Sequence, residues 1–345
     1  MYKRLFRPLL FLIDPETVHH LIVIFIRIIY RIPGITGIIR NIFTVKNRNL
    51  TRELFGLNFP NPVGLAAGFD KNAAFFREFM LFGFGFVEIG TVTPLGQTGN
   101  PKPRLFRIPK DHGLINRMGF NNMGLDSAIQ KLKKKPAGLI IGGNIGKNTL
   151  TPNDKAVDDY AKCFDGLYPY VDYFVINVSC PNICDLSELQ DKEQLRGILV
   201  RLSEIRSSKE SRKPILVKIS PDLNYNQIDD VMELITLTGM DGIVATNTTT
   251  SRDNLLTGHE LIDKIGKGGM SGEPLRNRSN EIIKYIYKKS GGSLTIIGSG
   301  GIMSPEDAKE KILAGAKLIE IYTGFIYDGP GIVKRINKAL IEKDK

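Results

Sequence analysis

Residues 173–182 read Tyr-Phe-Val-Ile-Asn-Val-Ser-Cys-Pro-Asn. The part from Tyr173 to Val178 is short, apolar and β-branched, which predicts a buried parallel strand. The end of this strand would bring the amides of Asn177 and Asn182 and the thiol of Cys180 into one pocket. Each amide offers a donor and an acceptor, which suits a planar, imide-like small molecule. Cys180 is a candidate general base, because a thiol pKa of about 8.5 can be lowered by its surroundings. The alternative is that Cys180 is only a small residue of the hydrophobic core.

Eight segments of this kind follow one another along the chain. They are residues 62–67, 84–91, 139–145, 173–178, 215–219, 242–246, 294–298 and 318–322. Stretches of helical period lie between most of them, for instance 188–207, 225–238, 279–289 and 305–314. Strands that alternate with helices eight times predict an α/β fold, the (β/α)8 TIM barrel. The alternative is a doubly wound sheet, but residues 64–68 lack the G-x-G-x-x-G order of a dinucleotide turn.

The carboxyl ends of barrel strands form one active face, so the polar residues there are read as a single site. They are Lys71, Thr91, Asn144, Asn177, Cys180, Asn182, Lys218, Thr246, Asn247, Thr248, Ser299, Tyr322 and Thr323. Amides and lysines without a carboxylate pair argue against glycoside hydrolysis and against a divalent metal. The glycine-rich turns 298–301 and 322–324 could cradle a phosphate. A phosphorylated heteroaromatic cofactor would fit both the amide and lysine side chains and the glycine-rich turns. The long insertion at 94–136 is predicted to be functional.

The first 48 residues have six more basic than acidic residues, yet the stretches 9–13 and 21–29 are strongly apolar. Asp14-Pro15-Glu16 predicts a helix start, so one short helix would end at Ile13 and a second would run to about Arg31. Neither is long enough to span a bilayer, which takes about 20 apolar residues. We expect residues 1–48 to form an amphipathic hairpin in a membrane interface, and residues 49–345 to form the barrel. A signal peptide and a hairpin docked on its own domain are the alternatives.

The composition of the whole chain narrows the class of protein further. Its 345 residues carry a net charge of +11, which favours an anionic partner such as phospholipid head groups, nucleic acid or an anionic substrate. The three cysteines form no disulfide framework and indicate a reducing compartment. No histidine stands in ligand spacing with Cys180 and Cys184, so we expect no metal.

Ordered motifs along essentially the whole chain resemble the dihydroorotate dehydrogenases. They are residues 61–71, 90–94, 102–107, 115–122, 144–148, 217–219, 245–249 and 268–275. The N-terminal hairpin, with Asp14-Pro15-Glu16-Thr17-Val18-His19, resembles class 2 of this family, which is membrane-associated and passes electrons to a quinone. Class 2 members usually carry Ser where this chain has Cys180, and Cys is usual in the soluble class 1. Residues 183–187 also lack the usual Thr, Gly and Arg. Because class 1 chains lack the hairpin, class 2 is preferred.

The resemblance implies two sets of contacts. FMN would be held by Ala67, Gly68, Phe69, Asp70, Lys71, Thr91, Asn144, Asn177, Lys218, Thr246, Gly272, Gly301, Tyr322 and Thr323. Dihydroorotate would contact Lys71, Asn116, Arg117, Met118, Gly119, Phe120, Asn177, Asn182, Asn247 and Thr248. The residue chemistry agrees, because amides match the edges of a pyrimidine and Lys71 can meet a carboxylate. Lys218 would bring positive charge near the flavin.

The reaction implied is a step of pyrimidine biosynthesis, the oxidation of dihydroorotate to orotate. Cys180 would remove the C5 proton, and a hydride would leave C6 for the flavin. The quinone would enter beneath the hairpin, near His19, Arg107 and Tyr322, at the cytoplasmic side of the cell membrane. A monomer is the expected oligomeric state.

Three alternatives remain open. A class 1-like enzyme would use fumarate or a protein partner. A dihydrouridine synthase-like enzyme would act on tRNA, but only about 20 residues follow the last strand, too few for an RNA-binding domain, so we expect no nucleic acid. A scaffold without catalysis would be colourless.

Overall fold

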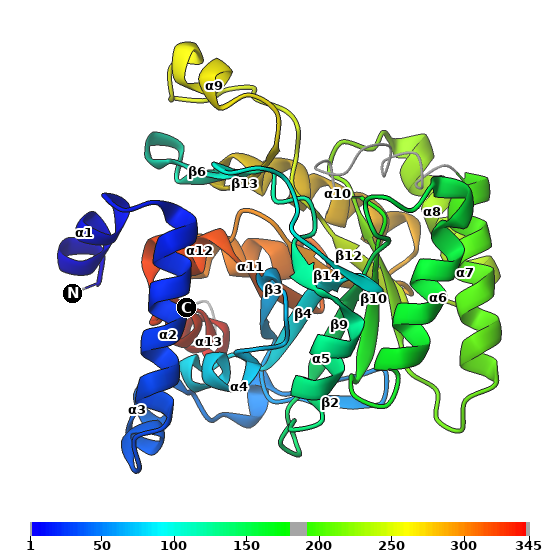
Figure 1. The fold of residues 1–345 in the computed structure, drawn as a ribbon, viewed down its shortest axis with the longest axis horizontal. Coiled ribbons are helices and arrows are strands. Elements are labelled where there is room, and N and C mark those ends of the chain that lie inside the picture. The colour runs from blue at the N-terminus through cyan, green and yellow to red at the C-terminus, as the bar shows by residue number, and fades with distance from the viewer. Residues whose placement is uncertain (1, 180–191, 343–345) are drawn as a thin grey trace.

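The computed structural model describes residues 2–179 and 192–342 (Figure 1). Eight parallel strands close into a barrel, in which β15 pairs with β3. They are β3 (Val63–Asp70), β4 (Phe86–Val92), β9 (Ile141–Ile145), β10 (Tyr173–Asn177), β11 (Ile215–Ile219), β12 (Gly242–Ala245), β14 (Thr295–Ser299) and β15 (Leu318–Ile321). Each predicted segment contains one of them or overlaps it, which confirms the TIM barrel. The closure excludes the open, doubly wound sheet.

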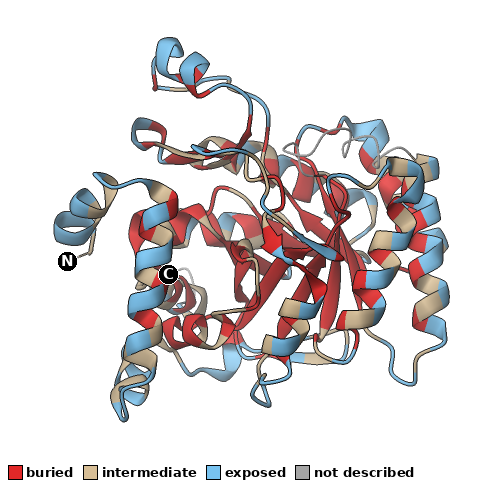
Figure 2. Cartoon of the chain, viewed as in Figure 1, coloured by how far each residue is buried: buried red, intermediate tan, exposed pale blue. Residues whose placement is uncertain are grey.

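The barrel strands are buried along nearly their whole length (Figure 2). Their side chains are mostly Val, Ile, Leu and Phe, as expected for parallel strands covered on both faces. A short antiparallel pair, β1 (Arg52–Leu54) and β2 (Leu57–Phe59), closes the amino-terminal end, where the ring of Phe59 lies 5.3 Å from that of Phe86. The polar residues collect at the opposite end.

Helices surround the barrel. They are α4 (Phe76–Phe79), α5 (Gly124–Leu132), α6 (Ala156–Leu167), α7 (Lys192–Ser207), α8 (Tyr225–Thr238), α10 (Arg276–Lys289), α11 (Pro305–Leu313), α12 (Thr323–Asp328) and α13 (Ile332–Ile341). Their starts follow ordinary capping rules. Asn224 and Gln227 form a capping box at α8, and Ser304 accepts from the Asp307 amide at α11. The predicted helices at 225–238, 279–289 and 305–314 are found within a few residues of their bounds. The start of the one predicted at 188 lies outside the described residues.

The insertion after β4 builds a second layer at the carboxyl ends of the barrel strands. Strands β6 (Leu105–Ile108) and β7 (Gly113–Asn116) form an antiparallel sheet with β13 (Gly269–Gly272), and β5 (Leu95–Gln97) pairs with β8 (Asn122–Met123). Helix α9 (His259–Ile265) projects beside this sheet (Figure 1). These two small sheets, β6–β7–β13 and β5–β8, cover the carboxyl-terminal end of the barrel, and we call them the roof.

The N-terminal segment contains a π-helical turn (Tyr2–Phe6), α1 (Arg7–Phe11), α2 (Pro15–Tyr30) and α3 (Ile35–Phe43). The predicted start of α2 is confirmed, because Asp14 accepts a 2.9 Å hydrogen bond from the Thr17 amide. Helix α3 was not predicted. Gly34, with φ of 82°, lets the chain turn into it after Pro33. Among the described residues no single helix is long and apolar enough to cross a membrane, although α2 and α3, bent by 117°, pass that test together by length and composition.

Candidate active site

A cavity lies at the carboxyl ends of the barrel strands, beneath the β6–β7–β13 sheet. Most residues predicted to bind cofactor or substrate line it. They are Ala67, Gly68, Lys71, Thr91, Asn116, Met118, Gly119, Phe120, Asn177, Lys218, Thr246, Asn247, Thr248, Gly272, Gly301, Tyr322 and Thr323. The barrel topology thus brings together side chains that are up to 256 positions apart in sequence, as Ala67 and Thr323 are.

Four predicted residues lie elsewhere. Asn144 is fully buried behind the cavity wall. Phe69 faces a second cavity, on the side of the N-terminal helices. Asp70 accepts hydrogen bonds from the Ala74 and Phe75 amides, and burial raises the pKa of its carboxyl to about 6. The Arg117 guanidinium lies 4.6 Å from the centre of the Phe106 ring and donates to backbone carbonyls. Cys180 and Asn182 lie outside the described residues.

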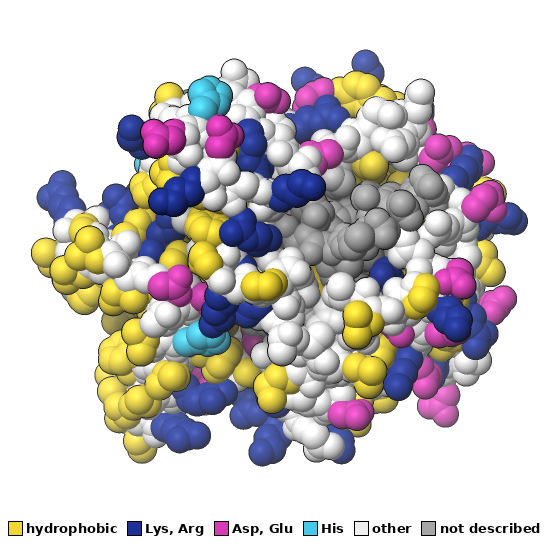
Figure 3. Space-filling model, turned by 45° about the horizontal axis from the view of Figure 1, so that its top comes forward, with side chains coloured by type: hydrophobic (Ala, Val, Ile, Leu, Met, Phe, Trp, Pro, Cys, Tyr) yellow, Lys and Arg dark blue, Asp and Glu magenta, His cyan; other side chains and the backbone are white. Residues whose placement is uncertain are grey.

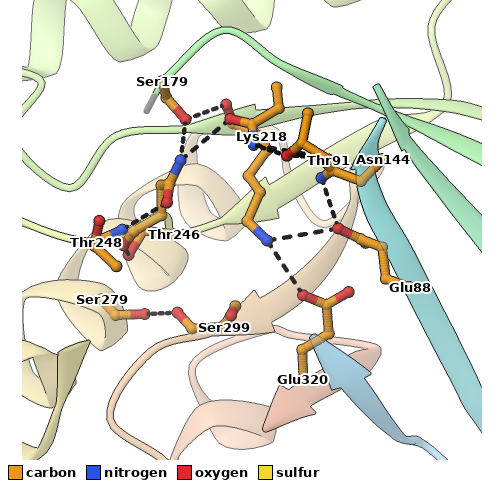
Figure 4. Close-up of polar contacts among 12 residues, drawn as sticks. Glu88, Thr91, Asn144, Ser179, Lys218, Thr246, Thr248, Ser279, Ser299 and Glu320 are labelled. Atoms are coloured by element: carbon orange, nitrogen blue, oxygen red, sulfur yellow. Dashed lines mark hydrogen bonds and ion pairs between the residues drawn. The ribbon is translucent and has the colours of Figure 1, made fainter. Parts of the chain in front are cut away.

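The amides form one hydrogen-bonded network across four strand ends (Figure 4). Asn177 Nδ2 donates to Thr91 Oγ1 at 2.9 Å, and Thr91 Oγ1 donates to Asn144 Oδ1 at 2.6 Å. Asn247 Nδ2 donates to Asn177 Oδ1 at 3.2 Å and to Ser179 Oγ at 3.0 Å. A network whose members satisfy one another has fixed orientations. The site therefore presents preorganised amide groups next to the position of Cys180 in the chain.

Beneath this network the barrel holds three charged groups, shown in Figure 4. Lys218 Nζ lies 3.5 Å from Glu88 Oε1 and 3.6 Å from Glu320 Oε2. Burial opposes the charge of Lys218, but the two carboxylates outweigh it, and its pKa is raised. Sequence reasoning named Lys218 and missed both glutamates. A single charged residue within a buried strand that is otherwise uncharged is the signal that would have found them.

Glycines let the backbone approach the cavity closely. A Cβ on Gly301 would lie 2.3 Å from the Cα of Arg276, and one on Gly272 would lie 2.4 Å from the His112 carbonyl oxygen. Both have positive φ, which favours glycine. Across the cavity rim, the hydroxyls of Ser271 and Thr323 lie 2.8 Å apart. Gly301 follows β14 and Thr323 follows β15, the last two barrel strands, while Gly272 ends β13, and backbone-rich segments of this kind can receive a phosphate.

The second cavity, of about 590 Å³, lies between the N-terminal helices and the barrel. Its lining is largely apolar and includes the three residues predicted for a quinone, His19, Arg107 and Tyr322. The Phe69 ring links two of them, because its centre lies 5.0 Å from that of His19 and 5.1 Å from that of Tyr322. Burial lowers the pKa of His19 to about 4. Arg107 is held at the edge, where it donates to the Ile13 carbonyl at 2.6 Å.

The two cavities share part of their wall. Gly68, Lys71, Met118 and Tyr322 line both of them. The Tyr322 side chain is partly buried, and desolvation of its hydroxyl raises the pKa of that group to about 12. A molecule in the barrel cavity and a molecule under the helices would therefore be separated by little more than this wall.

Helix α2 divides its apolar residues between two faces. Val18, Val23 and Ile26 are buried against the barrel. Leu21, Ile24, Phe25 and Ile28 are 53–62% exposed, and hydrophobic side chains gather over this side of the molecule in Figure 3. The segment is thus docked on its own domain, as one of the alternatives held, and still presents a large apolar surface.

Comparisons with known proteins agree in one family. The family model described as dihydroorotate dehydrogenase matches residues 49–343. A protein of Christiangramia forsetii named dihydroorotate dehydrogenase (quinone) is 50% identical over 343 residues, with 99% of each chain covered. A protein of the same name from Thermosynechococcus vestitus is 44% identical, with 99% of this chain and 96% of that one covered. The ligand-free DHODH of Eimeria tenella superposes with a TM-score of 0.85 and 37% identity, over 95% of this chain and 94% of that one.

Proposed function

The chain belongs to the dihydroorotate dehydrogenase family, and we propose that its barrel cavity binds FMN and dihydroorotate while the cavity under its N-terminal helices binds a quinone. Its reaction is the oxidation of dihydroorotate to orotate with a quinone as electron acceptor, a step of pyrimidine biosynthesis. The cofactor of this reaction is a flavin.

FMN is supported by the chemistry of the cavity. The backbone at Gly272, the end of β13, and at Gly301, after β14, has no room for a side chain, and such exposed backbone suits a phosphate group. Thr91, Asn177 and Lys218 supply hydroxyl, amide and ammonium groups for the polar edge of a flavin ring. When bound, FMN would accept two electrons from the substrate, and a quinone could then reoxidise it.

Dihydroorotate would lie against the roof. Lys71, which donates to Asn121 Oδ1 at 2.7 Å, would hold the carboxylate, and Asn116, Asn177 and Asn247 would orient the pyrimidine edges. Cys180 would accept the C5 proton. Ser179, its neighbour in the chain, is fixed by a 2.8 Å hydrogen bond from its hydroxyl to the Lys218 carbonyl oxygen, which supports a defined position at the strand end.

A peripheral location on the cytoplasmic side of the cell membrane is proposed from the outer face of residues 1–48. Exposed Leu21, Ile24, Phe25 and Ile28 would lie in the acyl boundary. A quinone could then pass from lipid into the cavity beside His19 and Arg107 without crossing water. We take residues 1–48 as this membrane and quinone segment and residues 49–345 as the catalytic barrel.

The observation that carries the proposal is the shared wall formed by Gly68, Lys71, Met118 and Tyr322. It would bring donor and acceptor sites to opposite sides of one flavin.

The test is anaerobic reduction of the purified yellow protein by dihydroorotate, followed by stopped-flow reoxidation. We expect fast reoxidation by a short-chain quinone and slow reoxidation by fumarate. Preferential reoxidation by fumarate would overturn the assignment of the second cavity, and a colourless protein would overturn the assignment of the first.

A further inference from the structure

The barrel interior beneath the cavity contains a cluster of three charged residues, of which the proposed function gives a role to Lys218 alone. Glu88 on β4, Lys218 on β11 and Glu320 on β15 converge there (Figure 4). The two glutamate side chains are 0% exposed and the lysine side chain is 6% exposed. Lys218 and Glu320 line the cavity, and Glu88 lies behind them. We refer to these three residues as the barrel triad.

The hydrogen bonds within the triad are incomplete among the described residues. Glu88 Oε1 accepts a 2.8 Å hydrogen bond from Asn144 Nδ2. Glu88 Oε2 and both carboxyl oxygens of Glu320 have no hydrogen-bond partner. The ammonium of Lys218 stands 3.5 and 3.6 Å from the two carboxylates, farther than the roughly 2.7–2.9 Å of a close ammonium–carboxylate hydrogen bond. Glu320 is therefore the least restrained member.

The charges of the triad do not balance when every group is ionised. Two carboxylates and one ammonium leave a net charge of −1 in the interior of the barrel, where an uncompensated charge is costly. A proton retained on one carboxyl restores neutrality. Burial and the neighbouring charge of Glu88 raise the pKa of Glu320, and Lys218 opposes them. Both glutamates also act on Tyr173 of β10, whose pKa is raised, mainly by burial, so its hydroxyl stays neutral.

We propose that Glu320 holds an exchangeable proton beneath the flavin, so that the barrel triad is neutral when Glu320 is protonated and carries one negative charge when it is ionised. This inference rests on the proposed binding of a flavin in the cavity that Lys218 and Glu320 line. Glu320 acts as a positioning residue, because it works through Lys218 and through the local charge and takes no part in bond breaking.

The proton couples to the redox state of the cofactor by linkage. Reduction adds electrons next to the triad, which makes Glu320 bind its proton more tightly, and coupling between two binding events is reciprocal. Over the pH range between the pKa of Glu320 in the oxidised protein and its pKa in the reduced protein, reduction would take up one proton beyond those the flavin itself binds. Above that range the negative triad would hold the reduction potential below that of a protein with a neutral triad.

The experiment is a potentiometric titration of the bound flavin at a series of pH values in the full-length protein and in Glu320→Gln. Gln keeps the shape of the side chain and stays uncharged. We expect the native protein to show a steeper segment, worth about one extra proton per two electrons, that Glu320→Gln lacks, and a higher potential for the variant at alkaline pH. Identical slopes in both proteins at every pH would overturn the inference.

Two further variants make the result specific. Glu88→Gln can still accept from Asn144 but removes the charge that opposes ionisation of Glu320, so the steeper segment should move to lower pH. Glu78→Gln removes another buried glutamate, which lies on α4 beside Arg27 and outside the cavity, and should leave the profile unchanged. A segment that responds equally to Glu78→Gln would count against the triad.

An infrared difference spectrum of the native protein, oxidised minus reduced, keeps the idea testable if Glu320→Gln fails to bind flavin. A perturbed band of a protonated carboxyl group is expected, and its absence at every pH would overturn the inference. Failure of the proposed function looks different, because a protein that never binds flavin gives no redox signal at all.

Discussion

Glu16 on α2 and Arg104, just before β6, form a two-pronged ion pair, with Arg104 Nη2 at 2.8 Å and Nε at 3.1 Å from the two carboxylate oxygens. Each side chain is only 8% exposed. The Arg104 interaction lowers the pKa of Glu16 despite its burial. The pair ties the helix that covers the second cavity to the sheet that covers the first.

Replacing Arg104 should loosen this connection. Arg104→Leu leaves the Glu16 carboxylate buried without its main partner, which costs about 3–5 kcal/mol for a buried pair. We expect quinone turnover to fall more than flavin reduction by dihydroorotate, and hydrogen exchange to increase along α2. Lys102→Ala is the matched control, because that lysine also reaches Glu16 but is 64% exposed. An equal effect of both variants would show that the buried geometry is not what matters.

The exposed face of α2 should determine membrane binding. Ile24→Asp places a charge in the centre of this face, where burial in the acyl boundary would be opposed. We expect the variant to bind phospholipid vesicles at least about tenfold more weakly in a sedimentation assay, since about 1.4 kcal/mol suffices for that change. Leu237→Asp, at a 69% exposed site on α8, should bind like the native protein. Unchanged binding of Ile24→Asp would exclude this face as the membrane contact.

His19 should make the stability of the protein depend on pH. Its pKa is lowered from 6.5 to about 4, chiefly by burial, so between these values the unfolded chain binds a proton that the folded chain does not. Stability is therefore full above pH 6.5 and is lost as the pH falls toward 4, by at most about 3 kcal/mol.

The measurement for His19 is urea unfolding at the two ends of this range. His19→Phe should flatten the dependence, while His20→Phe, at the exposed neighbour, should retain it. Equal slopes in all three proteins would show that His19 is not the group responsible.

Removing the thiol of Cys180 should separate binding from chemistry. Cys180→Ala is expected to keep the flavin spectrum, because all the proposed flavin contacts except Asn177 lie on other strands, and to slow flavin reduction by dihydroorotate by roughly 100- to 10,000-fold, the usual effect of a general base. Rapid-mixing measurements of flavin absorbance give the rate. A near-native rate would remove Cys180 from the mechanism.

Cys180→Ser tests whether ionisation of the thiol controls the rate. A thiol titrates near pH 8.5, whereas a serine hydroxyl does not ionise in the working range. We expect the Ser variant to be slower at neutral pH and to keep gaining activity at a pH where the native enzyme has levelled off. Superimposable pH profiles of flavin reduction would contradict a thiolate base.

The barrel could be predicted from sequence because one local pattern, a short apolar strand, recurs eight times with stretches of helical period between most of the copies. Helix α3 was missed because Pro33-Gly34 is a normal helix end, and no local signal shows that the chain resumes a helix at Ile35. Glu88 and Glu320 were missed for a different reason. They are 232 positions apart and meet only because β15 and β4 both pair with β3 in the closed barrel.

The placement of the two cavities on either side of Tyr322 has a kinetic consequence. Dihydroorotate would enter the barrel cavity from water, and the quinone would enter the cavity under the N-terminal helices from lipid. Because the two entrances are separate, neither reactant would have to wait for the other's product to leave. The bound flavin would then transfer electrons from a substrate dissolved in water to an acceptor dissolved in lipid. A compound that binds in the cavity under the N-terminal helices should leave flavin reduction by dihydroorotate intact while it stops turnover with quinone. If both reactants used one shared entrance, the compound would block both half-reactions.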